Sequence, residues 1–247
     1  MSAIGRAARV LQVLAETREA PSLADLSAAT GLPRSTVHRI VQELEIHHLV
    51  LPTSPNGGGY RLGPGVLKLT TSTYAHLAAA MRPSLVALSA AVDENVDLAV
   101  LSGGEVVVVD QISSSQRLQA VTEVGGIFPA HASCVGKVLL AALSDAEIQE
   151  RLTEPLVRYT ENTLTDTAVL LADIEETRRT GISFDRQEHD IGISAVATSV
   201  RTPMGITQAV SVVAPTHRFE RRSADYVAAL LELRANFDRS AAAAAAS

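Results

Sequence analysis

Residues 23–50, LADLSAATGLPRSTVHRIVQELEIHHLV, predict two short helices joined by a tight turn. Ser22 precedes the first helix and Asp25 follows three residues later, which is the spacing of a capping box. Gly31 suits the left-handed backbone that ends a helix. Pro33 suits the first residue of the next helix, because its missing N–H would have no intrahelical partner there. Two helices around a Gly-containing turn are typical of a helix-turn-helix.

The second of these helices, expected to run to about His48, has an apolar face and a polar face. Its apolar residues fall within about 100° of arc when each residue advances by 100°, and they are Val37, Ile40, Val41 and Leu44. The opposite face and the N-terminal flank contain only hydrogen-bonding side chains, namely Arg34, Ser35, Thr36, His38, Arg39 and Gln42. Such side chains read base edges and phosphates when a helix enters the major groove. An ordinary solvated surface is the alternative interpretation of this helix taken alone.

A hairpin is expected directly after this helix. Residues 49–53 and 60–62 have the composition of strands, and residues 54–59, SPNGGG, have that of a turn. A helix-turn-helix followed by a hairpin is a winged helix, so residues 1–64 are predicted to form a DNA-binding domain. Arg61 in the hairpin is placed to reach phosphate or the minor groove. A mobile surface loop is the alternative interpretation of the glycines.

Charge divides the chain in the same way. Residues 1–70 carry seven basic and five acidic side chains, a net charge of +2, whereas the other 177 residues carry 14 and 22, a net charge of −8. A basic N-terminal part, here called the head, attached to an acidic remainder, here called the body, fits a head that contacts phosphate. The single cysteine excludes an internal disulfide framework. Because no apolar run reaches the roughly 18 residues of a membrane helix, we expect a soluble, cytoplasmic protein without a membrane partner.

A helical connection is expected between the head and the body. Residues 65–82 have leucines and alanines at helical spacing, and a second helix is predicted to start at Pro83, because proline interrupts helices. Ala75, Ala78 and Ala79 form a face of small residues that permits close helix approach. This linker helix is therefore a candidate dimer contact, with core packing as the alternative.

The body, residues 83–240, changes to an apolar period of two. Strands are expected at 95–101, 105–112, 117–124, 182–185, 193–201 and 206–215. Helices are expected at 131–143, 165–180 and 220–238, and the Ala-rich tail at 241–247 is expected to be disordered or to fray. This order of elements predicts an α+β fold with an antiparallel sheet.

Several segments resemble one family. GLPRSTVHRI at 31–40 and YRLG at 60–63 resemble the N-terminal domain of the isocitrate-lyase-repressor (IclR) family of bacterial transcription regulators. LAVLSGGEVVVVDQI, HASCVGKVLLA and DRQEHDIGISAVATSV resemble successive segments of that family's effector domain. The resemblance implies a GAF/profilin-like effector-binding domain, homodimers that are often paired into tetramers, and effectors that are mostly small organic acids. It implies no catalytic activity and no cofactor.

The resemblance also implies an effector pocket at the start of the helix near His131, the loop 185–192 and the strand after it. The first turn of a helix attracts anions, so we expect a carboxylate at the amides of residues 132–134 and the Ser133 hydroxyl. The candidate effector-binding residues are Gly125, Gly126, His131, Ala132, Ser133, Cys134, Asp185, Ala195, Val196 and Ser211. Many relatives carry cysteine where this chain has Ala195, which leaves the effector's identity open.

His131 and Cys134 allow two other interpretations. They form a catalytic thiolate–histidine pair if Asp185 or Asp190 orients the imidazole, or a zinc site together with Asp185 and His189. No nucleophile motif and no compact ligand spacing supports either, so no catalytic and no metal-binding residue is assigned.

The sequence thus predicts a ligand-responsive transcriptional regulator that binds double-stranded operator DNA and a small-molecule effector. The linker helix is expected to carry the difference between the arrangements of the DNA-binding heads. Two other classes of protein stay open. One is a small-molecule enzyme with a winged-helix head that targets or oligomerises it, and the other is a winged-helix module that binds only protein.

Overall fold

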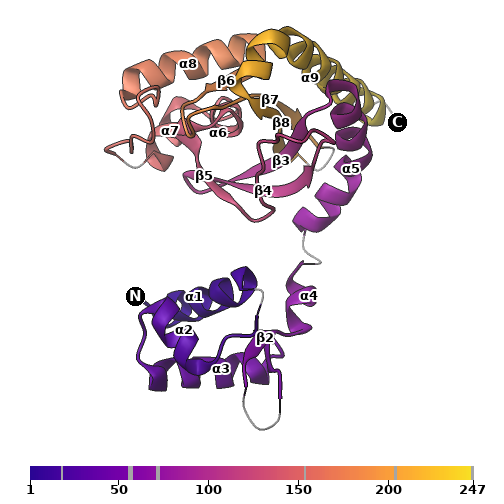
Figure 1. Cartoon of the computed structure of the whole chain (residues 1–247). Coiled ribbons are helices and arrows are strands. Elements are labelled where there is room, and N and C mark those ends of the chain that lie inside the picture. Colours follow the sequence, from indigo (N-terminus) through magenta and orange to yellow (C-terminus); the bar gives the residue numbers. More distant parts are fainter. Residues whose placement is uncertain (18, 55–57, 71–72, 153, 203–204, 246–247) are drawn as a thin grey trace. The chain divides into compact units, whose positions relative to one another are not determined.

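The computed structural model describes the chain except for residues 18, 55–57, 71–72, 153, 203–204 and 246–247. The chain forms two compact units, Met1–His76 and Leu77–Ser247 (Figure 1).

The N-terminal unit is a winged helix-turn-helix, as predicted. Its elements are α1 (Ala3–Glu16), α2 (Leu23–Thr30), α3 (Arg34–Ile46), β1 (Val50–Pro52) and β2 (Tyr60–Leu62), followed by α4 (Gly65–Thr70). The two strands pair antiparallel, with Leu51 opposite Arg61. One apolar cluster holds the helices and the hairpin together, and its buried members are Val10, Leu14, Leu26, Val37, Val41, Leu44 and Val50.

Local signals set the helix ends in this unit. Ser22 and Asp25 form the reciprocal capping box, and Gly31 ends α2 with a φ of 69°. Pro33 differs from the prediction: it is the N-cap of α3 rather than its first residue, with extended backbone at ψ 140°. Its carbonyl accepts a hydrogen bond from Val37 N at 3.0 Å, so the helix begins at Arg34. The expected turn residues 55–57 lie outside the described residues.

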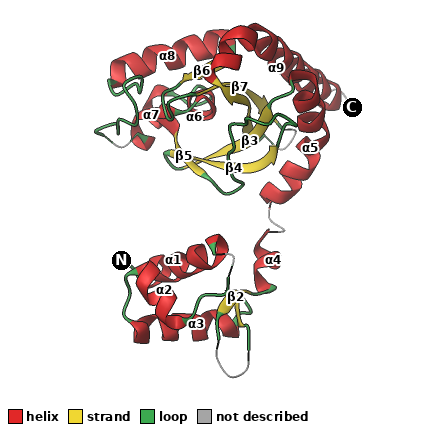
Figure 2. Cartoon of the chain, in the orientation of Figure 1, coloured by secondary structure: helices red, strands yellow, loops and turns green. Residues whose placement is uncertain are grey.

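The C-terminal unit is built on a six-stranded antiparallel sheet, as predicted for an α+β fold. The strand order is β5-β4-β3-β8-β7-β6. The strands are β3 (Asn95–Ser102), β4 (Glu105–Ile112), β5 (Ile127–Pro129), β6 (Ile182–Arg186), β7 (Ile193–Arg201) and β8 (Thr207–Pro215). Figure 2 shows helices on both sides of these strands.

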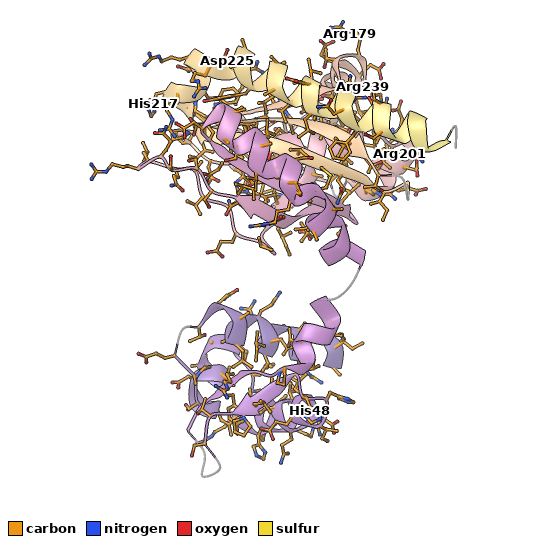
Figure 3. The ribbon with its side chains drawn as sticks, turned by 90° about the vertical axis from the view of Figure 1, so that its right-hand side faces the viewer. His48, Arg179, Arg201, His217, Asp225 and Arg239 are labelled. Carbon is orange, nitrogen blue, oxygen red and sulfur yellow. The ribbon has the colours of Figure 1, made fainter. Side chains whose placement is uncertain are left out.

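Each face of the sheet has its own apolar layer. The helices α5 (Thr73–Val92) and α9 (Thr216–Ala245) cover one face, and Figure 3 shows them side by side, with His217 and Arg239 near the two ends of α9. The helices α6 (Cys134–Leu140), α7 (Asp145–Arg151) and α8 (Thr167–Thr180) cover the other face. Successive strand residues point to opposite faces, so Ala195 joins the α6 layer and Val196 the α5–α9 layer.

Pro83 does not start a new helix, contrary to the prediction, because α5 runs through it. A proline in a helix interior costs about 3 kcal/mol. The face of α5 that lies on the sheet buries Met81, Leu85 and Leu88, and each such burial contributes about 1.5–3 kcal/mol. Packing therefore outweighs the lost backbone hydrogen bond.

The strand predicted at 117–124 is wrong, because that segment is irregular. Gly125, at a φ of 88°, turns the chain and donates its N–H to the Val108 carbonyl at 2.8 Å. The strand that forms on this side of β4 is the short β5, which follows the turn and places Ile127 opposite Val107.

Other boundaries also differ from the sequence prediction. The helix expected at 131–143 is a 3-10 turn, η1 (Ala130–Ala132), and then α6, separated by the extended backbone of Ser133. The short α7 was not predicted, although Ser144 and Glu147 form a capping box at its start. The last helix is longer than expected, since α9 extends through Ala245 into the Ala-rich tail.

Candidate functional site

The polar residues of α3 form one outward surface of the N-terminal unit, here called the recognition face. Its members are Arg34, Ser35, Thr36, His38, Arg39 and Gln42, of which Thr36 is half-buried and the others are exposed. Val37, Val41 and Leu44 occupy the opposite side of α3 and are buried. Within the described part of the unit, no side chain of the recognition face forms a hydrogen bond. These donors and acceptors are therefore free to meet an external partner.

The hairpin is held against the helices beside this face. Tyr60 N donates to the Pro21 carbonyl at 2.9 Å. Gly59 lies so close to Ala20 that an added Cβ would be 2.1 Å from the Ala20 carbonyl oxygen. Arg61 follows on β2 and is exposed. The predicted DNA-contacting residues thus gather on α3 and the wing, within one unit.

The C-terminal unit contains a cavity of about 260 Å³ between the sheet, the start of α6 and the irregular segment before β5. Five of the ten predicted effector-binding residues line it, namely Ser133, Cys134, Asp185, Ala195 and Ser211. Lining residues that the prediction missed include Asp97, Gln119, Thr122 and Phe128. His189 and Asp190 also line the cavity, and they belong to the loop 185–192 where the pocket was expected. Asp97 had a visible signal, because it is the one charged residue in the otherwise apolar run VDLAVL.

The other five predicted residues are not among the lining residues. Gly125 and Gly126 form the turn before β5. His131 is buried in η1, with Nε2 2.9 Å from the Val157 carbonyl oxygen. Ala132 is buried in the same turn. Val196 packs on the other side of the sheet with α5 and α9.

The start of α6 differs from the one on which the predicted carboxylate site at residues 132–134 was based. Because α6 begins at Cys134, His131 is not in its first turn. The Ser133 hydroxyl donates to the Pro129 carbonyl at 3.0 Å and accepts from Gly136 N at 3.2 Å. Ser133 thus serves as the N-cap of α6.

Burial shifts the pKa values of three side chains that line the cavity, Asp97, Cys134 and Asp185. Burial raises the pKa of Asp97 to about 6, against hydrogen bonds from Thr122 and Gln111. Burial also raises the pKa of Asp185 to about 7. For Cys134, burial and then the nearby Asp185 raise the pKa of the thiol well above its usual range. The thiol is neutral at physiological pH and hence a weak nucleophile.

A buried ion cluster lies beside the cavity. Lys137 on α6 is 1% exposed, and its Nζ is 2.8 Å from both carboxylate oxygens of Glu188 and 3.0 Å from Oδ2 of Asp173. Burial opposes the charge of Lys137, but the two carboxylates outweigh it and raise its pKa. Glu188 N donates to Asp185 Oδ1 at 2.7 Å, which connects this cluster to the cavity lining.

The arrangement gives no support to the catalytic and zinc interpretations. His131 directs Nε2 to a backbone carbonyl, and the Cys134 thiol stays protonated. Among the described residues, no group of three or more His, Cys, Asp or Glu side chains is arranged to hold a metal ion.

Two family models match the chain. The model described as bacterial transcriptional regulator IclR C-terminal matches residues 70–237, and the IclR helix-turn-helix domain matches residues 3–51. The chain belongs to the IclR family. It is thus a member of a family of DNA-binding transcriptional regulators, as its sequence motifs predicted.

Named IclR-family relatives span nearly the whole chain. The HTH-type transcriptional regulator Rv1719 of Mycobacterium tuberculosis is 40% identical over 92% of this chain and 88% of its own length. The regulator TtgV of Pseudomonas putida is 37% identical over 96% of this chain and 90% of its own length. An IclR homologue from Microbacterium hydrocarbonoxydans, solved with 4-hydroxybenzoate, has a TM-score of 0.79 at 26% identity, covering 96% of this chain and all of that one. Rv1719 and TtgV are named as transcriptional regulators, which argues against the enzyme interpretation.

Among the described residues, no helix combines the length and the apolar character that a membrane crossing requires.

Proposed function

We propose that this protein regulates transcription by binding operator DNA through the recognition face and Arg61. The observation that carries the proposal is a helix face of hydrogen-bonding side chains, largely exposed and unpartnered within the described N-terminal unit, beside the paired strands β1 and β2. In winged and related helix-turn-helix proteins the second helix of the motif, which is α3 here, lies in the major groove with its N-terminal residues on base edges. The protein acts where the chromosome lies, in the cytoplasm.

The cavity of the C-terminal unit is the proposed effector site. It is partly apolar, it is small, and it contains a few buried polar groups, which is the usual composition of small-molecule sites. The Microbacterium homologue, whose structure contains 4-hydroxybenzoate, supports a small-molecule effector for this chain. A ligand changes DNA affinity only if it prefers one arrangement of the DNA-binding units, and the linker at residues 65–82 is proposed to carry that difference.

A homodimer, or a pair of homodimers, is the proposed functional assembly. One winged helix contacts too little DNA for selective binding, whereas two related units read two half-sites one or more helical turns apart. The alanines of the linker were predicted to provide a dimer contact. Ala79 is exposed and Ala78 packs on the α5–α9 layer, and the side chain of Ala75 lies outside the described residues.

The first prediction tests the recognition face with a matched pair of variants. Arg39→Ala should weaken binding to the DNA upstream of the protein's own gene by roughly 1–3 kcal/mol, because it removes one base or phosphate contact. Arg9→Ala removes the same charge from an exposed position on α1 and should have a clearly smaller effect. Fluorescence anisotropy with labelled duplexes over a range of salt concentrations measures both. Equal losses in the two variants would contradict the assignment of the recognition face.

A further inference from the structure

The floor of the cavity contains a polar pair with unused hydrogen-bonding capacity. Asp97 on β3 and Ser211 on β8 are opposite each other in the antiparallel register, and both line the cavity. Opposed residues have Cβ atoms about 5 Å apart on the same face. Ser211 is 1% exposed, and its hydroxyl has no hydrogen-bond partner in the described part of the chain. Because buried hydroxyls are nearly always hydrogen-bonded, this one points to a ligand.

The charges around this pair are acidic. The carboxyl groups of Asp97, Asp185 and Asp190 line the cavity, and no lysine or arginine is among the described lining residues. The Nδ1 atom of His189 is 2.8 Å from Oδ2 of Asp190, so this side chain already has a carboxylate partner. The nearby Lys137 is engaged by Glu188 and Asp173. An anionic ligand would therefore find no unpaired cation among the described groups.

The polar pair calls for a particular ligand group. Thr122 donates to Asp97 Oδ1 at 2.7 Å, and an ionised carboxylate offers about four lone-pair sites, so Asp97 can accept again. The Ser211 hydroxyl can donate and accept. A ligand hydroxyl can donate to Asp97 and accept from Ser211, and so match both. A carboxylate can only accept, and an ammonium can only donate.

The rest of the cavity fits an apolar body of limited size. Its apolar lining includes Val108, Phe128, Ile193, Ala195 and Val213. An engineered apolar cavity of roughly 150 Å³ accepts benzene. A cavity of about 260 Å³ therefore has room for one ring with a short substituent.

We infer that the effector is a small, largely apolar alcohol or phenol, whose hydroxyl sits between Asp97 and Ser211, and not a carboxylate. This inference rests on the proposed function, since it assigns a ligand class to the proposed effector site. It differs from the carboxylate expected from the sequence, because a further anion would face Asp97 and Asp185 in a buried site. It also gives Asp97 a role that neither the motifs nor their spacing suggested.

The test uses three ring compounds of similar size with the full-length protein at about pH 8, where Asp97 is ionised. They are benzyl alcohol, its apolar isostere ethylbenzene, and benzoate. Isothermal titration calorimetry should give benzyl alcohol an affinity about ten-fold or more above that of each of the other two, because only the alcohol satisfies the polar pair without adding an anion.

Two variants and one control show whether the polar pair is responsible. Ser211→Ala should weaken benzyl alcohol about ten-fold and leave ethylbenzene unchanged. Asp97→Asn should raise the affinity for benzoate relative to benzyl alcohol about ten-fold, which mere loss of structure cannot do. Ser183→Ala is the control, since Ser183 is another buried serine of the same sheet with an unpartnered hydroxyl, but it is not among the residues that line this cavity. Thermal melts without ligand show whether each variant is folded.

The results separate this inference from the proposed function. Wild-type protein that prefers benzoate or ethylbenzene, or that binds none of the three compounds, overturns the hydroxyl assignment. A folded Asp97→Asn variant that keeps the wild-type ratio of benzoate affinity to benzyl alcohol affinity also overturns it. DNA binding by the same preparations is measured in parallel. Wild-type protein that does not bind DNA contradicts the proposed function instead, whatever the ligand result.

Discussion

At the scale of single residues, the C-terminal unit concentrates buried charge around Lys137. Breaking a buried ion pair by removing one partner typically costs about 3–5 kcal/mol, because the remaining charge has lost its compensation. Lys137 has two carboxylate partners and almost no exposed surface. Its position could not be predicted from the sequence, because burial of a lysine depends on carboxylates that follow 36 and 51 residues later.

Lys137→Met is therefore expected to lower the free energy of unfolding by about 3–5 kcal/mol, since Glu188 and Asp173 would lose their buried cation. Urea denaturation followed by circular dichroism measures this loss. In the Lys137→Met background, Glu188→Gln should recover part of the stability by removing the uncompensated charge. A loss under about 1 kcal/mol for the single variant would mean that the cluster is not buried as described.

Asp185 should make stability depend on pH. Burial raises its pKa from 3.8 to about 7 in the folded protein, and the charge of Glu188 adds to the rise, against the hydrogen bond from Glu188 N and the charges of Lys137 and His189. The folded state holds this proton more tightly than the unfolded state, so the contribution to stability is present at low pH and is lost as the pH rises through about 7. Asp185→Asn should shrink the fall in melting temperature between about pH 5 and about pH 8. An unchanged pH dependence would show that Asp185 ionises normally.

At the scale of elements, the structure follows the sequence wherever local signals agree with packing. The capping box at Ser22 and the apolar stripe of α3 both predicted what is observed. Pro83 misled the prediction, because the buried face of α5 outweighs a local signal. The segment 117–124 misled it too, because the chain stays irregular there and backbone hydrogen bonds to β4 begin only at Gly125. Ala195 lines the cavity and Val196 does not, because successive residues of a strand point to opposite faces of the sheet. The motif alone does not say which of the two faces the cavity.

The wing provides a prediction at this scale. Gly59→Ala should destabilise the N-terminal unit by about 1–3 kcal/mol, because the added Cβ meets backbone atoms of Ala20 that cannot move cheaply. Gly58→Ala is the matched control, since the nearest atom to its added Cβ is the Thr53 hydroxyl oxygen at 3.3 Å, a contact that a shift of a few tenths of an ångström relieves. Thermal unfolding of the two variants compares them. Equal melting temperatures would mean that the hairpin is not seated against the start of α2.

At the scale of the whole molecule, the two units divide DNA recognition from ligand recognition. The residues proposed to contact DNA all lie between Arg34 and Arg61, and those proposed to hold the ligand lie between Asp97 and Val213. Charge follows the same division, with a net charge of +2 in residues 1–70 and −8 in the rest. This division was predictable from composition and motifs. The cavity's ligand class was not, because it depends on which side chains from all six strands of the sheet meet.

Selection of bound sequences from a pool of randomised duplex DNA tests the central claim most directly. Full-length wild-type protein is expected to enrich a motif with two related half-sites one or more helical turns apart, as two recognition faces require. The folded Arg39→Ala variant should lose the preference at one or more positions of each half-site. A wild-type pool without any enriched motif, or an unchanged motif in the variant, would contradict the role assigned to the recognition face.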